Sequence, residues 1–418
     1  MLASHRPNPQ PSSTPPLGIS LSQSDLPPSQ TEEINQYGYL QHRWSSKSPS
    51  RYTCTFLSII PAGTMVGLSY LLYSLINTNA LILLKLIGDQ DLSVAFGLAR
   101  AFILVFLDSL GPSNSEVLAM IVARFYGSRR PDKVKIAFTN SLLFMALTNI
   151  LYWVFIYFIY AKILQLLHLN ERIIELSCQI MYMYCPFFTV YLLNNILGCY
   201  LIAQGVSTGS YILILPSALL SIGLMYFLHF FYSLGLWSFF IAGVSFELIN
   251  LAVFLWMYFT KIDDEYKGVA GLTTALRYCC SYFKDFSLFA FTYVVEIAGW
   301  EIMIYFSLLS GNDDSVICIQ SVMNVATYII FFSYGFSDKS ASVIGILLGA
   351  KLKKAARKFA TIYVMGMLLL GMIIGSLIFV CSDYISKVFV DKHTNPDLYL
   401  MIKNTIKIYA LWAPQDLI

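Results

Sequence analysis

The chain has 418 residues, of which 57% are hydrophobic and only 12% are charged. Soluble domains contain about 25% charged residues, so this composition excludes a water-soluble domain and indicates a polytopic, all-α membrane protein. The formal net charge of +3 is too small to favour binding of nucleic acid.

Residues 1–50 are rich in proline, serine and glutamine, with stretches such as PNPQPSSTPPLG. Such a segment cannot bury enough apolar surface to fold alone, so it predicts a disordered tail. It contains no apolar stretch of the signal-peptide type. The first membrane-spanning helix is therefore expected to target the chain to the membrane.

Ten apolar segments follow this tail, and each is predicted to cross the membrane as a helix. The sixth and seventh segments are separated by a polar stretch that contains KIDDEYKG. We therefore divide the chain into an N-lobe (51–260), an inter-lobe connector (261–285) and a C-lobe (286–418). The ten segments lie at about 55–84, 92–122, 136–160, 176–202, 210–232, 236–259, 286–309, 315–337, 359–381 and from 401 onward.

The placement of basic residues predicts the orientation of the chain. Five of them follow the second segment and five follow the eighth, whereas the loops GDQD and GNDD after the first and seventh segments are acidic. By the positive-inside rule, the basic loops, the tail and the connector are expected on the cytoplasmic side. The basic residues are Arg124, Arg129, Arg130, Lys133 and Lys135, and then Lys351, Lys353, Lys354, Arg357 and Lys358.

The two halves of the chain resemble each other at a nearly constant spacing. The interval from Gly127 to Gly349, which we call the repeat interval, is only one position shorter than the interval from Gly88 to Gly311. The surrounding loop charges also match, which indicates an internal duplication. Six spans per half is an even number, so the two halves should be related by an axis along the membrane normal. A second half as long as the first would extend about 65 residues beyond Ile418, so we expect this C-lobe to hold about four of six helices.

Helix-weakening residues stand at equivalent places in the second and eighth segments, at Gly111–Asn114 and Gly335–Asp338. Both are expected to interrupt the helix. Paired interruptions in two repeats point to a transport pathway, while a kink for packing is an equally good interpretation.

The seventh segment carries two carboxylates, Glu296 and Glu301, and no basic residue. An ionisable side chain at membrane depth costs at least ~2.5 kcal/mol and usually handles an ion or a substrate. Function is therefore favoured over a structural hydrogen bond to a neighbouring helix. Five residues turn a helix by about 500°, so the two acids cannot bind one ligand from the same face.

Other charged residues also fall within the predicted spans. Arg100, Asp108 and Glu116 recur at a constant spacing and form a staggered strip on the second segment. Salt bridges to neighbouring helices are their expected role, and Glu247 in the sixth segment leaves the structural and functional interpretations open. No zinc-protease, serine-hydrolase or phosphate-loop motif occurs, and the eight cysteines have no CxxC spacing. The sequence therefore predicts neither an enzyme nor a metal or cofactor site.

Three stretches resemble one family of transporters. Residues 335–358, GFSDKSASVIGILLGAKLKKAARK, resemble the family's eighth-span signature, G-x-S-x-A-x-S-x-x-x-G-x-x-L-G-A. Residues 186–205 end in YLIAQG, which is similar to the fourth-span segment Y-L-x-A-Q-G, and VEIAGWE at 295–301 is similar to the seventh-span pattern L-E-W-W-x-F-E. From about Cys54 onward the chain thus resembles the eukaryotic-type multidrug and toxic compound extrusion (MATE) family. The residues in register include Gly335, Gly345 and Gly349 of the eighth span and Gln204 of the fourth.

This resemblance implies two six-helix lobes that open alternately to the two sides of the membrane. It implies secondary active antiport, in which organic cations or other xenobiotic, amphipathic compounds leave the cytoplasm in exchange for protons or sodium. The family's second-lobe cation site carries over to Glu296, Glu301 and Asp416, with Glu296 assigned to proton and cation exchange and with Glu301 and Asp416 shaping the cavity. Bacterial members often place an acid in the first span, where this chain has Asn77 and Asn79. A cation site in the N-lobe is therefore not expected.

Two other interpretations remain open at this stage. A flippase of the same superfamily would move lipid-linked or other amphipathic cargo, and would favour a basic lining over paired acids. A transport-inactive scaffold or sensor would use the carboxylates structurally. The expected partners are a small-molecule organic substrate, a proton or sodium ion, and the lipid bilayer. The protein is expected to be a monomer in the plasma membrane or in a vacuolar or endosomal membrane.

Overall fold

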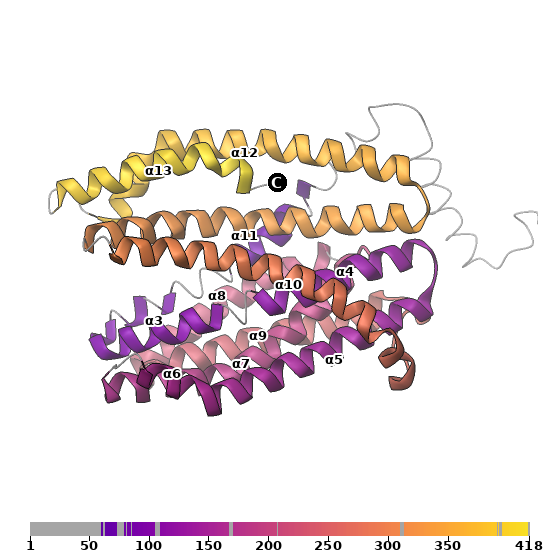
Figure 1. The fold of residues 1–418 in the computed structure, drawn as a ribbon, viewed down its shortest axis with the longest axis horizontal. Coiled ribbons are helices and arrows are strands. Elements are labelled where there is room, and N and C mark those ends of the chain that lie inside the picture. Colours follow the sequence, from indigo (N-terminus) through magenta and orange to yellow (C-terminus); the bar gives the residue numbers. More distant parts are fainter. Residues whose placement is uncertain are drawn as a thin grey trace, which may run out of the picture. The chain divides into compact units, whose positions relative to one another are not determined.

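The computed structural model describes residues 60–61, 63–72, 79–80, 82–84, 86–104, 109–166, 170–206, 208–309, 313–390, 392 and 395–416. Throughout these residues the regular elements are helices, and no strand occurs among them (Figure 1). Six of the helices are long and apolar enough to cross a membrane. The prediction of an all-α, multi-pass membrane protein is therefore confirmed. The tail predicted at 1–50 lies outside the described residues.

The described helices follow the predicted apolar segments in chain order. Helical residues Gly63–Leu72 belong to the first segment, and α3 and α4 belong to the second. The third segment contains α5, the π-helix η3 and α6, which together form one span. The bounds are α3 Gln90–Leu104, α4 Gly111–Gly127, α5 Pro131–Phe155, η3 Ile156–Tyr160, α6 Ala161–Leu166, α7 Glu171–Ala203, α8 Thr208–Tyr232, α9 Trp237–Lys261, α10 Leu272–Leu309, α11 Asp313–Gly349, α12 Lys353–Phe389 and α13 Pro396–Asp416.

Helix α10 is longer than the apolar segment that predicted it. It begins at Leu272, whereas the predicted span begins at residue 286. The intervening residues contain neither glycine nor proline, so nothing in them breaks a helix. More than half of the polar stretch at 261–285 is therefore helical, and only residues 262–271 form a non-helical connection.

The predicted interruption at residues 335–338 is wrong, because α11 runs without a break from Asp313 to Gly349. Gly335 serves a close contact instead, since a Cβ atom there would lie 2.1 Å from the backbone nitrogen of Gly67. In the second segment, by contrast, α4 begins at Gly111, and Pro112 lies in its first turn. A proline at that place costs no helical hydrogen bond. The two sets of helix-weakening residues thus have different roles.

The C-terminal ends of α4 and α11 have the same backbone geometry. Arg129 (φ 53°) and Lys351 (φ 61°) are both left-handed, and they are separated by the repeat interval. The duplicated sequence therefore folds into duplicated structure. The hydrogen bonds that close the two helices match at the same spacing: Ser128 N–H to Arg124 O, Arg129 N–H to Tyr126 O and Arg130 N–H to Phe125 O correspond to Ala350 N–H to Ile346 O, Lys351 N–H to Leu348 O and Leu352 N–H to Leu347 O.

Helix α7 is the central helix of the first half and contacts α3, α4, α5 and α9. Its Asn194 side chain donates from Nδ2 to the backbone oxygen of Glu247 at 2.8 Å and to Oε2 of the same residue at 2.5 Å. Both side chains are buried. Glu247, whose role the sequence left open, therefore joins α9 to α7 inside the first half.

Replacing Asn194 by leucine is expected to lower the melting temperature, because the buried Glu247 carboxyl then loses its hydrogen-bond donor. An unsatisfied buried polar group costs about 1–3 kcal/mol of the free energy of unfolding. The double variant Asn194→Leu/Glu247→Leu removes both polar groups and should recover part of this loss. Thermal unfolding in detergent, followed by tryptophan fluorescence, compares the variants. Equal melting temperatures for Asn194→Leu and the wild type would show that this bond stabilises nothing.

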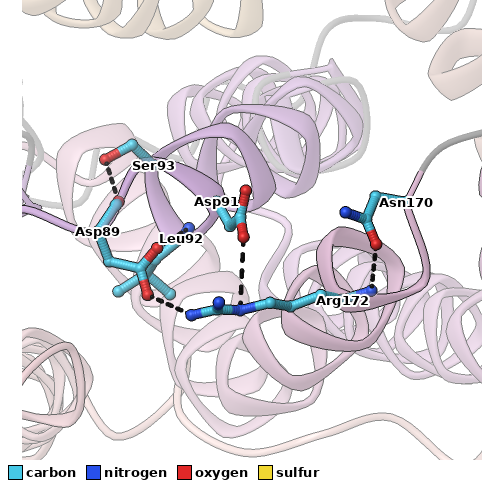
Figure 2. A network of polar contacts seen from close by, with 6 residues as sticks. All are labelled: Asp89, Asp91, Leu92, Ser93, Asn170 and Arg172. Atoms are coloured by element: carbon cyan, nitrogen blue, oxygen red, sulfur yellow. Dashed lines mark hydrogen bonds and ion pairs between the residues drawn. The ribbon is translucent and has the colours of Figure 1, made fainter.

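An exposed charge cluster joins the beginnings of α3 and α7 (Figure 2). Arg172 donates from Nη2 to Asp89 Oδ2 at 3.0 Å, and its Nε lies 3.4 Å from Asp91 Oδ2. The side chain of Asn170 accepts a hydrogen bond from the Arg172 backbone N–H and so caps α7. Because the Arg172 side chain is 61% exposed, each ion pair contributes at most ~1 kcal/mol. The cluster fixes the position of two helix ends and adds little stability.

The connection between α9 and α10 is bound to the first half along most of its length. Ile262 and Tyr266 are buried. Tyr200 Oη donates to the backbone oxygen of Tyr266 at 2.6 Å, and the N–H of Ala270 donates to Thr139 Oγ1 at 2.8 Å. Thr139 lies on α5 and Tyr200 on α7. The connection therefore belongs to the first half almost to the residue where α10 begins.

Candidate functional site

The two halves meet where α4 crosses α11, close to the basic loops. A Cβ atom on Gly127 would lie 2.2 Å from the backbone oxygen of Ile346, and one on Gly349 would lie 2.0 Å from the backbone oxygen of Arg124. Only glycine fits at such distances, so the two backbones touch. Arg124 and Ile346 are themselves separated by the repeat interval, which makes the contact reciprocal, as a two-fold axis requires. Gly345 packs in the same crossing, against Ala123.

Each half also places a second helix against the other half. Residues 63–72 pack on α11, where Gly63 meets the ring of Phe336. In the corresponding place α10 packs on α4, and Tyr282 Oη donates to Asn114 Oδ1 at 2.8 Å. The halves are thus interlocked near the crossing. A buried cluster joins α10 to α4 and α5 and consists of Val117, Phe144, Tyr282, Phe286 and Ala290.

Two tyrosine–carboxyl hydrogen bonds lie within these interlocked contacts. Tyr70 Oη donates to Asp338 Oδ2 at 2.8 Å, and Tyr293 Oη donates to Glu116 Oε1. Both carboxyl groups are partly buried. Asp338 and Glu296 also lie within electrostatic range of Glu116. Three carboxyl groups therefore gather where α4, α10 and α11 meet.

Among the described residues, Glu116 and Asp338 are held by tyrosines and not by basic side chains. Neither Glu116 nor Asp338 takes part in any ion pair of the described residues. The salt bridge expected for Glu116 is thus replaced by the bond to Tyr293. Arg100, on the separate helix α3, takes part in none of these ion pairs either, and Asp108 lies outside the described residues.

The structure describes the predicted cation-site residues unequally. The Glu296 side chain is exposed on α10, and its charge reaches Glu116. Glu301 also lies on α10 and Asp416 ends α13, but both side chains lie outside the described residues. Gln204 is buried directly after α7, where Gly205 turns the chain with a φ of 83°. Of the predicted cation-site residues, Glu296 is the one that the described interactions place near Glu116.

Sequence reasoning missed the partnership of Glu116 with Asp338. It treated Glu116 as one member of a charged strip and Asp338 as part of a helix interruption. The spacing of the duplication contains the missing signal, because the repeat interval separates Glu116 from Asp338 and, to within one position, Tyr70 from Tyr293. Two acids at equivalent positions of two repeats predict a pair beside the axis that relates them.

Comparisons with known proteins agree with this architecture. The sequence profile of the MatE family matches residues 66–227 and 289–418. The fold is similar to that of the eukaryotic MATE transporter AtDTX14, with a TM-score of 0.77, 16% identity, and coverage of 88% of this chain and 80% of that one. A mutant of the Vibrio cholerae MATE transporter VcmN has a TM-score of 0.76 and 12% identity, with coverage of 87% and 81%.

A more distant likeness is to a MOP superfamily transporter from Pyrococcus furiosus, described as having a binding pocket of reverse polarity that suggests a different function. Its TM-score is 0.67 at 15% identity, with coverage of 85% of this chain and 79% of that one. The sequence has no match among the curated proteins. At sequence identities this low, the structural matches establish the shared fold alone.

Proposed function

Because this chain belongs to the MATE family of membrane transporters, we propose that it exports organic cations or other amphipathic compounds in exchange for protons or sodium ions. Secondary transport across a membrane follows from membership of the family. The direction, the class of substrate and the coupling ion are the proposed part.

One observation carries the proposal, namely the gathering of Glu116, Glu296 and Asp338 where helices of both halves meet. Carboxyl groups at membrane depth are expensive, and they are retained where an ion or substrate binds. Negative charge in such a place attracts cations and protons. A basic lining, which would suit an anionic lipid-linked cargo, is the opposite arrangement.

Glu296 is the residue to which we assign the exchange. Its side chain is exposed on α10, and the carboxyl groups of Glu116 and Asp338 accept hydrogen bonds from tyrosines. An ionised Glu296 attracts a cationic substrate, and a proton on the same carboxyl removes that attraction. The two ligands compete for one charge, so each lowers the affinity for the other by the same factor. Competition of this kind gives antiport when the site faces the two sides of the membrane in turn.

The test is transport by the purified protein in liposomes loaded with a fluorescent organic cation. An imposed pH gradient, and separately an imposed sodium gradient, should each be tried as the driving force. Cation movement that requires one of these gradients supports antiport and names the coupling ion. Movement of a lipid-linked probe without a gradient would favour the flippase, and no movement of either probe would favour the transport-inactive scaffold.

A further inference from the structure

The two tyrosine–carboxyl hydrogen bonds are copies of each other. The repeat interval separates Glu116 from Asp338, and the interval from Tyr70 to Tyr293 is only one position longer. In one bond the first half supplies the tyrosine and the second half the acid, and in the other bond these roles are reversed. The two bonds therefore lie on opposite sides of the axis that relates the halves.

The two acids also lie at the same depth relative to the glycine crossing. Glu116 precedes Gly127 on α4 by the same number of positions as Asp338 precedes Gly349 on α11. This separation corresponds to about three helical turns, which span about 16 Å. A repulsive force between the acids therefore acts on α4 and α11, the two helices that contact each other at Gly127 and Gly349.

Within the part of the chain that the structure describes, the titratable groups near the acids come from five helices. On α10 they are Tyr293 and Glu296, and on α11 the neighbouring groups are Tyr334 and, next to Asp338 in the chain, Lys339. Neither acid forms an ion pair within the part of the chain that the structure describes. The remaining titratable groups within electrostatic range are Tyr70 of the first span, Cys199 of α7 and Tyr363 of α12.

We propose that Glu116 and Asp338 form one shared proton-binding site, and that the bound proton holds the two halves closed at the α4–α11 crossing. Two ionised carboxylates that lie close together in a poorly solvated place repel each other, and one proton between them removes the repulsion. The acids stand on different halves, so they separate when the halves separate, and both can then ionise. The closed arrangement thus binds the proton more tightly than the open one. By linkage, the proton favours the closed arrangement.

The place of this step in a transport cycle rests on the proposed antiport, but the closure itself can be measured without a substrate. Ser128 and Ala350 flank the glycine crossing from the two halves, since a Cβ atom on Gly349 would lie 3.0 Å from the backbone nitrogen of Ser128. Cysteines at Ser128 and Ala350, in a chain whose native cysteines are replaced by serine, can be cross-linked by a short bifunctional thiol reagent.

In the wild-type background, the fraction of protein that cross-links should fall as the pH rises. One linked proton changes the ratio of closed to open protein by at most about tenfold per pH unit. Thiol reactivity increases with pH, so a falling yield reports separation of the halves and not the chemistry of the reagent. A yield that does not fall would overturn the proposal.

The acid variants provide the decisive comparison. Glu116→Gln, Asp338→Asn and the double variant should each cross-link with a yield that no longer falls with pH, because repulsion needs both charges. Two single variants guard against a double variant that fails to fold. A wild-type pH profile in either single variant contradicts the shared site.

Glu296→Gln separates this proposal from the proposed function. It should retain a falling cross-linking profile, because both members of the shared site remain, and the fall should move to lower pH because Glu116 loses one neighbouring negative charge. Suppose that neither the wild type nor any variant transports a cation, but the dependence of cross-linking on pH still requires Glu116 and Asp338. The proposed antiport then fails and the shared proton site stands. If transport is normal and the profile is flat, the reverse holds.

Discussion

The variant Glu296→Gln is expected to abolish pH-driven cation movement, reducing it to the rate of protein-free liposomes. Glutamine has the shape of a protonated glutamate but can neither release the proton nor attract a cation by charge. The variant has no charged form at this position, so neither the proton nor the cationic substrate can bind there by charge. The measurement is the initial rate of cation movement in liposomes under a pH gradient, at matched amounts of protein.

The matched control is Glu175→Gln on α7. Glu175 is also an exposed glutamate on a long helix, but it lies in the first turns of α7 and is hydrogen-bonded to Gln179. Its replacement should leave both the rate and the melting temperature unchanged. Normal pH-driven movement by Glu296→Gln would remove Glu296 from the exchange and leave the assignment to another acid.

Adding one methyl group at the glycine crossing is expected to destabilise the protein and to stop transport. In Gly349→Ala the new Cβ would lie 2.0 Å from a backbone oxygen, and in Gly127→Ala it would lie 2.2 Å from one. A backbone atom cannot move aside as a flexible side chain can, so the helices must part. Overpacking of this kind costs about 1–3 kcal/mol. Because the contact is reciprocal, either substitution should have the same effect on melting temperature and on transport rate.

Two glycines elsewhere in the chain are the controls for this prediction. Gly97 on α3 and Gly223 on α8 have open space around them, because apart from the glycine, its chain neighbours and the nearby backbone of its own helix, no atom lies within 4 Å of the position that an added Cβ would take. Alanine is favoured over glycine in a helix by about 1 kcal/mol, so Gly97→Ala and Gly223→Ala should keep or slightly raise the melting temperature. Similar losses in all four variants would show that glycine content as such, and not the crossing, sets the effect.

The sequence predicted the class of protein, its helices and its duplication, because these follow from composition and spacing. Long apolar stretches must become helices in a bilayer, where backbone groups have no other partner. The repeat interval between Gly127 and Gly349 identified them as equivalent residues, and the structure brings both into one contact. The MATE resemblance found in the spans is confirmed by the family match.

The tyrosine–carboxyl bonds could not be predicted from local patterns. Their partners are 268 and 177 residues apart in the chain, and nothing near Glu116 in sequence indicates a bond to Tyr293. The same limit explains the wrong interruption at 335–338, because Gly335 weakens an isolated helix but in the fold makes room for Gly67. A glycine can either weaken a helix or allow another backbone to approach closely, and the packing around it decides which effect is seen.

The bound connection between α9 and α10 has a consequence for the movement of the halves. A free linker of about 25 residues would have an end-to-end distance of about 25–30 Å. Such a linker would lower the effective concentration of one half near the other. Here the chain is fixed to the first half as far as Ala270, and α10 begins at Leu272. The first turns of α10 therefore stay at a very high effective concentration beside α4 and α5. In the proposed transport cycle, we therefore expect rotation of the second half to be accommodated by bending within α10, beyond the buried cluster at Tyr282 and Phe286, and not by slack in the linker.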